Sequence, residues 1–222
     1  MQQLARAIEK LSPDKAPGPD GITNRILKKN FKILQHHLLA LVQATINVDH
    51  FPTPLKETTT IILRKPHKPD YTRPNAYRPI ALESTLGKIL ESIVAELISY
   101  LTETYDLLPP EHFGGRPGRT AEDAMIILSE NIHSAWKQRE VYSVVFMDIA
   151  GAFNNVHHKR LIHNMRKRRI PVFITNWIRS FLHERRTHLQ FNGTISKSIY
   201  TPVEVPQGST SIDNCTDTKF WA

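Results

Sequence analysis

The chain has 222 residues, of which 40% are hydrophobic and 23% are charged. This balance excludes a largely disordered protein and is typical of one sizeable globular domain. Lys and Arg number 29 against 21 Asp and Glu, and the resulting net charge of +8 favours a polyanionic partner such as nucleic acid over a merely soluble basic protein.

The single cysteine, Cys215, excludes an intramolecular disulfide and a metal site built from cysteines, and it weakly favours an intracellular protein. Residues 1–10 are amphipathic and lack the apolar centre of a signal peptide. No apolar run approaches the roughly 18–20 residues of a membrane span. We therefore expect no membrane association.

In chain order, apolar spacing first predicts a short helix over 4–11. Residues 12–21 are too rich in Pro and Gly for regular structure. Thr23 can cap the next predicted helix, whose apolar face runs over 26–46.

A basic β-hairpin is predicted next. Residues 58–63 indicate a strand that ends in Arg64 and Lys65, a Pro-rich loop follows, and 79–82 indicate the returning strand. The residues 86–101 then predict a long helix that is well buried.

The second half begins with a Gly-rich loop at 112–119 and a helix over 124–132. The β-rich apolar residues 144–147 predict a buried strand. Two helices and a hairpin follow, and the hairpin turns at Asn192-Gly193, the strongest short signal for a type I′ turn. The later elements are predicted over 161–165, 174–182 and 187–200, and 210–222 reads as a frayed end.

Asp148 follows the predicted strand 144–147 directly. A carboxylate at the end of a buried strand is costly unless a cation meets it, and Mg²⁺ prefers a few carboxylates together with substrate phosphates. The pattern alone leaves open an ordinary Asp that ends a strand before a turn.

Five motifs in this order and at plausible spacings resemble the reverse transcriptase of LINE-type (non-LTR) retrotransposons, from about Ser12 to Ser209. The resemblance implies an α/β (α+β) fold, namely the fingers and a partial antiparallel palm of a right-hand polymerase, with the thumb absent. It divides the chain into a fingers-like region with N-terminal helices at 1–140, a partial palm at 141–209 and a divergent tail at 210–222. The motifs are Ala-Pro-Gly-Pro-Asp-Gly at 16–21, Tyr-Arg-Pro-Ile-Ala-Leu at 77–82, Phe-Gly-Gly-Arg-Pro-Gly-Arg-Thr at 113–120, Met-Asp-Ile-Ala-Gly-Ala-Phe-Asn-Asn-Val at 147–156 and Val-Pro-Gln-Gly-Ser at 205–209.

By this resemblance, Asp148 is the catalytic, metal-binding aspartate and the backbone carbonyl of Ile149 is a second metal ligand. Phe153 matches the aromatic steric gate that excludes a 2′-hydroxyl. Its alternative is a core phenylalanine.

Lys65 and Arg78 match the cations that hold the incoming triphosphate, and their alternative is a solvated basic loop. Gln207 and Gly208 match the nucleotide-side Gln-Gly, and their alternative is a turn without a ligand.

Arg116 and Arg119 are expected to contact the template or primer backbone, unless their loop only leads into a helix. The basic run at 166–169 is a solvated helix face, a nucleic-acid contact or a nuclear-import patch. The family further implies Mg²⁺ or Mn²⁺, an RNA template, a DNA primer, deoxynucleoside triphosphates and a nuclear location.

Three features depart from the family pattern. Asn154 replaces an expected acid, 210–214 replaces an expected Pro and apolar helix, and the sequence contains no Asp-Asp dipeptide. Because Mg²⁺ pairs in polymerase-type sites rely on several carboxylates, we expect that this chain alone does not polymerise and is a truncated copy or a fragment. The rival hypotheses are a non-catalytic nucleic-acid-binding remnant and a product that does not fold stably.

Overall fold

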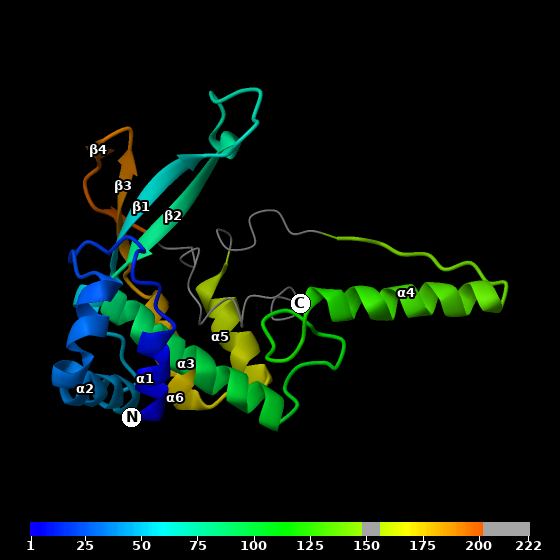
Figure 1. Cartoon of the computed structure of the whole chain (residues 1–222), viewed down its shortest axis with the longest axis horizontal. Coiled ribbons are helices and arrows are strands. Elements are labelled where there is room, and N and C mark those ends of the chain that lie inside the picture. The colour runs from blue at the N-terminus through cyan, green and yellow to red at the C-terminus, as the bar shows by residue number, and fades with distance from the viewer. Residues whose placement is uncertain (148–155, 202–222) are drawn as a thin grey trace.

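The structure is a computed structural model that describes residues 1–147 and 156–201. It is a mixed α/β fold in which helices form a body and a hairpin projects from it (Figure 1). None of the helices in these two ranges is both long and apolar enough to span a bilayer. The helices are α1 (Gln2–Glu9), α2 (Asn24–Asn47), α3 (Thr85–Thr104), α4 (Ala121–Lys137), α5 (His158–Lys167) and α6 (Val172–Leu182), and the strands are β1 (Glu57–Arg64), β2 (Tyr77–Glu83), β3 (Arg186–Phe191), β4 (Thr194–Ile195) and β5 (Ile199–Tyr200).

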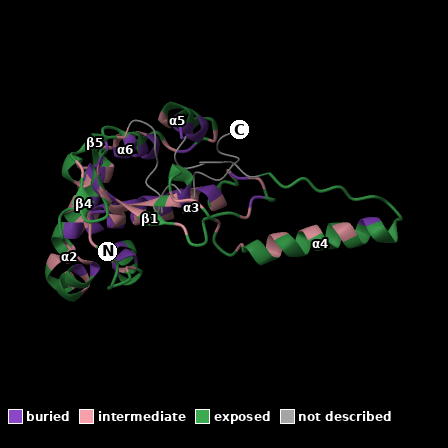
Figure 2. Ribbon diagram, turned by 90° about the horizontal axis from the view of Figure 1, so that it is seen from above, coloured by how far each residue is buried: buried purple, intermediate pink, exposed green. Residues whose placement is uncertain are grey.

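The core is built around α3, as its broad apolar face predicted. The buried apolar residues of α3 form one cluster with those of α1, α2, α5 and α6, whereas α4 is largely exposed (Figure 2). An aromatic cluster packs α6 against the loop after α2. The centroid of the Phe51 ring lies 5.3 Å from that of Trp177 and 5.0 Å from that of Phe181, both in edge-on geometry. All three side chains are buried, and such aromatic pairs add about 0.5–1.5 kcal/mol each beyond their buried area.

The sheet is mixed, with the strand order β2-β1-β3-β4 and with β5 also paired to β3. The predicted hairpin at 58–82 is confirmed as the antiparallel pair β1–β2, in which Thr58 lies opposite Glu83. The predicted hairpin at 187–200 is also confirmed, and its turn residues Asn192 and Gly193 both have positive φ, 48° and 79°, as a type I′ turn requires.

A parallel pairing of β1 with β3 joins the two hairpins into one sheet. The hydroxyls of Thr60 and Thr187 are 2.7 Å apart in a buried hydrogen bond across this pair. The strand β3 falls in the range 141–209 that the sequence assigned to a partial palm, yet it is part of the same sheet as the fingers-like hairpin.

A buried ion pair connects this sheet to the helices. The Arg185 Nη2 atom donates to Glu83 Oε1 at 2.6 Å, and each side chain is only 4% exposed. The Arg185 guanidinium also lies 4.4 Å from the centroid of the Phe181 ring. The end of β2 and the start of β3 are therefore held together against α6.

The Pro- and Gly-rich loop at 16–21 packs against the junction between β2 and α3. A Cβ on Gly18 would lie 2.5 Å from the Ser84 nitrogen and 2.6 Å from the Glu83 carbonyl carbon, so only glycine fits this close approach. Asp20 accepts a hydrogen bond of 2.7 Å from the Ser84 hydroxyl. This family motif therefore has a structural role that the sequence did not predict.

One predicted strand is wrong. Residues 141–147 form no strand, and Val145, Phe146 and Met147 are 81–87% exposed. An extended apolar segment needs a neighbour that satisfies its backbone hydrogen bonds, and no described strand lies beside it. The preceding helix α4 forms as predicted but extends away from the body (Figure 1), with Met125 and Trp136 exposed.

We predict that Gly18→Ala lowers the free energy of unfolding by about 1–3 kcal/mol, because the added methyl must displace backbone and not a flexible side chain. Urea denaturation followed by circular dichroism measures this change, and the exposed substitution Ala16→Ser is its control. Equal stability of the two variants would contradict the close packing at Gly18. A cooperative transition of the unaltered chain would also reject the hypothesis of a product that does not fold stably.

Candidate nucleotide and nucleic-acid interface

The hairpin β1–β2 brings Lys65 and Arg78 to one face of the sheet. Arg78 lies opposite Leu63 in the ladder, and the Lys65 amide continues the ladder by donating to the Ala76 carbonyl at 2.9 Å. Since side chains alternate along a strand, Leu63, Lys65 and Arg78 share a face.

These two cations differ in their surroundings. The Lys65 ammonium donates to the Asn75 carbonyl at 3.0 Å, within the loop that closes the hairpin. The Arg78 side chain is exposed and has no hydrogen bond or ion pair with any residue in 1–147 or 156–201. No described residue therefore occupies its guanidinium donors, which suit an anionic ligand.

Arg116 is held inside the protein. Its Nε and Nη2 atoms donate to the two carboxylate oxygens of Glu103 at 2.7 and 2.8 Å, and Nη1 donates to the Pro109 carbonyl at 3.0 Å. The side chain is 6% exposed. The hydrogen bond from Arg116 lowers the pKa of Glu103, and the same bond raises the pKa of Arg116. This geometry gives Arg116 a structural role, and its contact with template stays a prediction.

Arg119 is less enclosed. Its Nη1 atom donates to the Pro110 carbonyl at 2.5 Å, and its guanidinium lies 5.2 Å from the centroid of the Phe113 ring. The residue that follows, Thr120, caps α4 through a reciprocal pair with Asp123. The loop thus leads into a helix, as the alternative reading stated, while Arg119 keeps donors for a phosphate.

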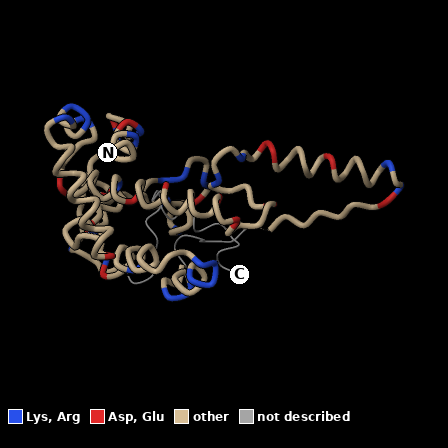
Figure 3. Tube along the Cα trace, turned by 90° about the horizontal axis from the view of Figure 1, so that it is seen from below, with Lys and Arg blue, Asp and Glu red and all other residues tan. Residues whose placement is uncertain are grey.

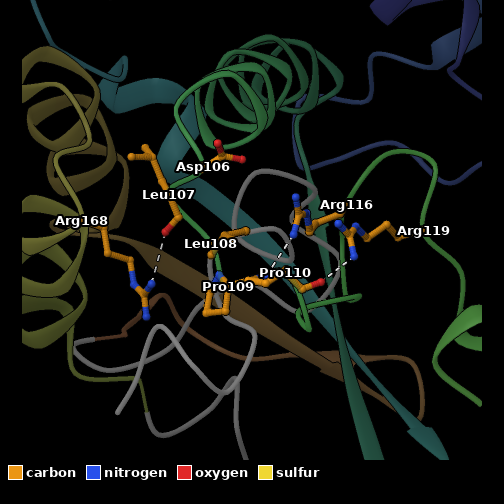
Figure 4. Close-up of a pocket in the computed structure, with 8 residues that line it drawn as sticks. All are labelled: Asp106, Leu107, Leu108, Pro109, Pro110, Arg116, Arg119 and Arg168. Atoms are coloured by element: carbon orange, nitrogen blue, oxygen red, sulfur yellow. Dashed lines mark hydrogen bonds between the residues drawn. The ribbon is translucent and has the colours of Figure 1, made fainter. Parts of the chain in front are cut away.

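A cavity of about 490 Å³ lies beside this loop (Figure 4). Arg116 and Arg119 border it from one side, and Arg168 reaches it from the end of α5, where its Nη1 atom donates to the Leu107 carbonyl at 3.3 Å. The basic run at 166–169 thus contributes one side chain to a cavity and is not only a solvated helix face. The remaining lining residues are Asp106, Leu107, Leu108, Pro109 and Pro110.

Positive charge alone does not locate a binding surface. Lys and Arg occur on several separate parts of the chain, including the far end of α4 (Figure 3). Geometry distinguishes two places: the hairpin, where strand pairing brings Lys65 and Arg78 together, and the cavity, where Arg168 joins Arg116 and Arg119 from a distant part of the sequence.

Five predicted site residues lie outside the described residues: Asp148, Ile149, Phe153, Gln207 and Gly208. The two expected metal ligands are among them. Within 1–147 and 156–201, no group of three or more His, Cys, Asp or Glu side chains could hold a metal ion.

Sequence reasoning missed two contributors to this region. Glu103 lies beyond the helix predicted over 86–101, and no local pattern shows that its carboxylate faces Arg116 thirteen residues later. Arg168 belongs to the basic run at 166–169, but its place beside Leu107 depends on how α5 packs.

Comparison with protein families decides the identity of the chain. Residues 63–211 match the family described as "Reverse transcriptase (RNA-dependent DNA polymerase)". This chain belongs to the reverse transcriptase family. The match includes Lys65, Arg78, Arg116 and Arg119.

The curated relatives of this reverse transcriptase chain come from non-LTR retrotransposons, which confirms the resemblance. It is 30% identical over 209 residues to the "Probable RNA-directed DNA polymerase from transposon BS" of Drosophila melanogaster. This alignment covers 94% of this chain and 23% of that protein. It is 30% identical over 207 residues to the corresponding protein of the Drosophila melanogaster X-element, covering 93% of this chain and 23% of that protein. It is 28% identical over 213 residues to the Pol polyprotein of element R2 from Popillia japonica, covering 93% of this chain and 28% of that protein. The chain therefore spans about a quarter of the length of these relatives.

We predict that Glu103→Gln reduces the acid sensitivity of folding. Because the folded-state pKa of Glu103 lies below its ordinary value near 4.5, its stabilisation is present above that value and is lost as the pH falls through the folded-state pKa. Melting temperatures between pH 3 and 7 test this, with the exposed Glu111→Gln as the control. If the melting temperature of both variants falls with decreasing pH as steeply as that of the unaltered protein, the pairing of Glu103 with Arg116 is contradicted.

Proposed function

We propose that this chain forms the part of a non-LTR retrotransposon reverse transcriptase that holds the incoming deoxynucleoside triphosphate and the template–primer. Membership of the family supports the reaction class, and the pairing of Lys65 and Arg78 on one hairpin face supports the nucleotide-binding role. The observation that carries the proposal is the exposed guanidinium of Arg78, which has no partner among the residues that the structure describes.

The two cations would act on the charge of the triphosphate. Phosphoryl transfer spreads negative charge over the phosphate oxygens, and catalysis depends on positioning and on fixed positive charge. Arg78 is suited to a bidentate contact with phosphate, whereas Lys65 supplies a point charge. The hydrogen bond of Lys65 to Asn75 keeps its ammonium near the tip of the hairpin.

The remaining site residues complete this proposal. Asp148 and the Ile149 carbonyl would hold Mg²⁺ or Mn²⁺, which stabilises charge on the attacking and leaving oxygens when bound. Phe153 would exclude a ribose 2′-hydroxyl, and Gln207 and Gly208 would line the nucleotide side.

The cavity supports the template–primer part of the proposal. Arg119 and Arg168 reach it from elements far apart in sequence and would contact backbone phosphates there. The nuclear location that the family implies also stays a prediction.

We predict that Arg78→Ala weakens binding of dATP about ten- to a hundredfold, because a charge-assisted contact to phosphate is worth about 1.5–3 kcal/mol. Isothermal titration with dATP and with deoxyadenosine measures this, and only dATP binding should change. The exposed Lys29→Ala on α2 is the matched control. Unchanged dATP affinity in Arg78→Ala would refute the role of this residue.

We further predict that the 222-residue chain does not extend a DNA primer on an RNA template in Mg²⁺ or Mn²⁺. Its sequence contains no Asp-Asp pair to complete a two-metal site with Asp148. Incorporation that Asp148→Ala abolishes would overturn this expectation. Absence of extension together with salt-dependent binding of the same template would favour the second candidate, a non-catalytic nucleic-acid-binding module, which the three-arginine cavity also supports.

A further inference from the structure

The sheet carries a group of aromatic rings on the face opposite Lys65 and Arg78. Arg64 lies opposite Tyr77 in the β1–β2 ladder, and each is the sequence neighbour of one of those cations. Because neighbouring side chains in a strand point to opposite faces, Arg64 and Tyr77 occupy the other side of the hairpin.

Three rings form a continuous group on this side. The Tyr77 ring centroid lies 6.1 Å from that of Tyr71 and 5.5 Å from that of Phe191, both in edge-on geometry. The group therefore extends from the hairpin loop across the sheet to β3. The Arg64 guanidinium lies 5.5 Å from the centroid of the Tyr71 ring.

Hydrogen bonds to backbone carbonyls hold the side chains of the two tyrosines in place. The Tyr71 hydroxyl donates to the Lys65 carbonyl at 2.8 Å, and the Tyr77 hydroxyl donates to the Tyr71 carbonyl at 2.9 Å. These bonds hold the rings in place before any ligand arrives, which lowers the entropy cost of binding.

The rings are accessible and lie beside positive charge. Phe191 is 37% exposed and both tyrosines are partly exposed. Arg64 and Lys68 are exposed, whereas the charge of Arg73 is offset by Asp70, 3.4 Å away. Partly exposed rings on a sheet with cations at the edge are what unpaired bases and their phosphates require.

We propose that the aromatic face, defined as Arg64, Tyr71, Tyr77 and Phe191, binds single-stranded nucleic acid by base stacking and phosphate contact. This inference rests on the proposed role of the chain in nucleic-acid synthesis, and it adds a site on the side of the hairpin away from the triphosphate cations. The stacking rings supply contact that does not depend on base identity, and Arg64 supplies the contact to phosphate.

Phe191→Leu tests the stacking, because leucine keeps the apolar packing and removes the ring. Fluorescence anisotropy compares a labelled single-stranded dT oligonucleotide with an abasic strand of the same length. We expect dT binding to weaken about tenfold, the scale of one lost stacked base, and abasic binding to stay unchanged. Phe173→Leu on α6 is the matched control, since Phe173 is 38% exposed.

Three further variants keep the proposal testable if Phe191→Leu disturbs folding. Tyr77→Phe keeps the ring and loses only the hydrogen bond to the Tyr71 carbonyl, so it should weaken dT binding less than Tyr77→Leu, which removes the ring. Arg64→Gln, at an exposed position, should weaken both strands and reduce the salt dependence by about one released counterion.

The proposal fails if Phe191→Leu and Tyr77→Leu bind the dT oligonucleotide as the unaltered protein does, or if they weaken abasic binding equally. These outcomes are independent of the triphosphate site, because Arg78→Ala is expected to change dATP binding and leave dT binding intact. Loss of dT binding in the Phe173→Leu control would also overturn the assignment.

Discussion

The buried ion pair between Glu83 and Arg185 is the constraint on which the arrangement of the sheet depends. Both charges are almost completely removed from solvent, so either one left without its partner would carry a large desolvation cost. The pair therefore requires that the end of β2 and the start of β3 meet at one place. Arg185 extends this requirement to α6, because its guanidinium lies over the Phe181 ring.

The same junction fixes the direction of the hairpin. Gly18 and Asp20 lie against the backbone and hydroxyl at Glu83 and Ser84, so the N-terminal loop supports the base from which β1 and β2 project. Near the tip of the hairpin, Leu63, Arg64 and Arg78 are exposed. Because side chains alternate along the two strands, Lys65 and Arg78 lie on one side of the hairpin and the aromatic face lies on the other.

Local patterns predicted the elements well and their partners poorly. Apolar periodicity located α3, and Asn192-Gly193 located a turn, because both signals act over a few residues. The pairing of β1 with β3 and the contact of Glu103 with Arg116 are tertiary, and no local pattern contains them. The strand expected at 144–147 is wrong for the same reason, since a β-rich composition does not by itself provide a neighbouring strand to pair with. In the candidate site, the family resemblance predicted the hairpin cations Lys65 and Arg78. The position of Arg168 at the cavity depends on the packing of α5 and could not be predicted from the sequence.

The hydrogen bond between Thr60 and Thr187 joins residues 127 positions apart. During synthesis on the ribosome, the hairpin β1–β2 is complete long before β3 emerges. Until then, the free edge of β1 presents unpaired amides and carbonyls, and the loop that must close is long. Folding of this sheet is therefore expected to be slow compared with the helices, and the nascent hairpin is the stage most exposed to misassembly with other chains.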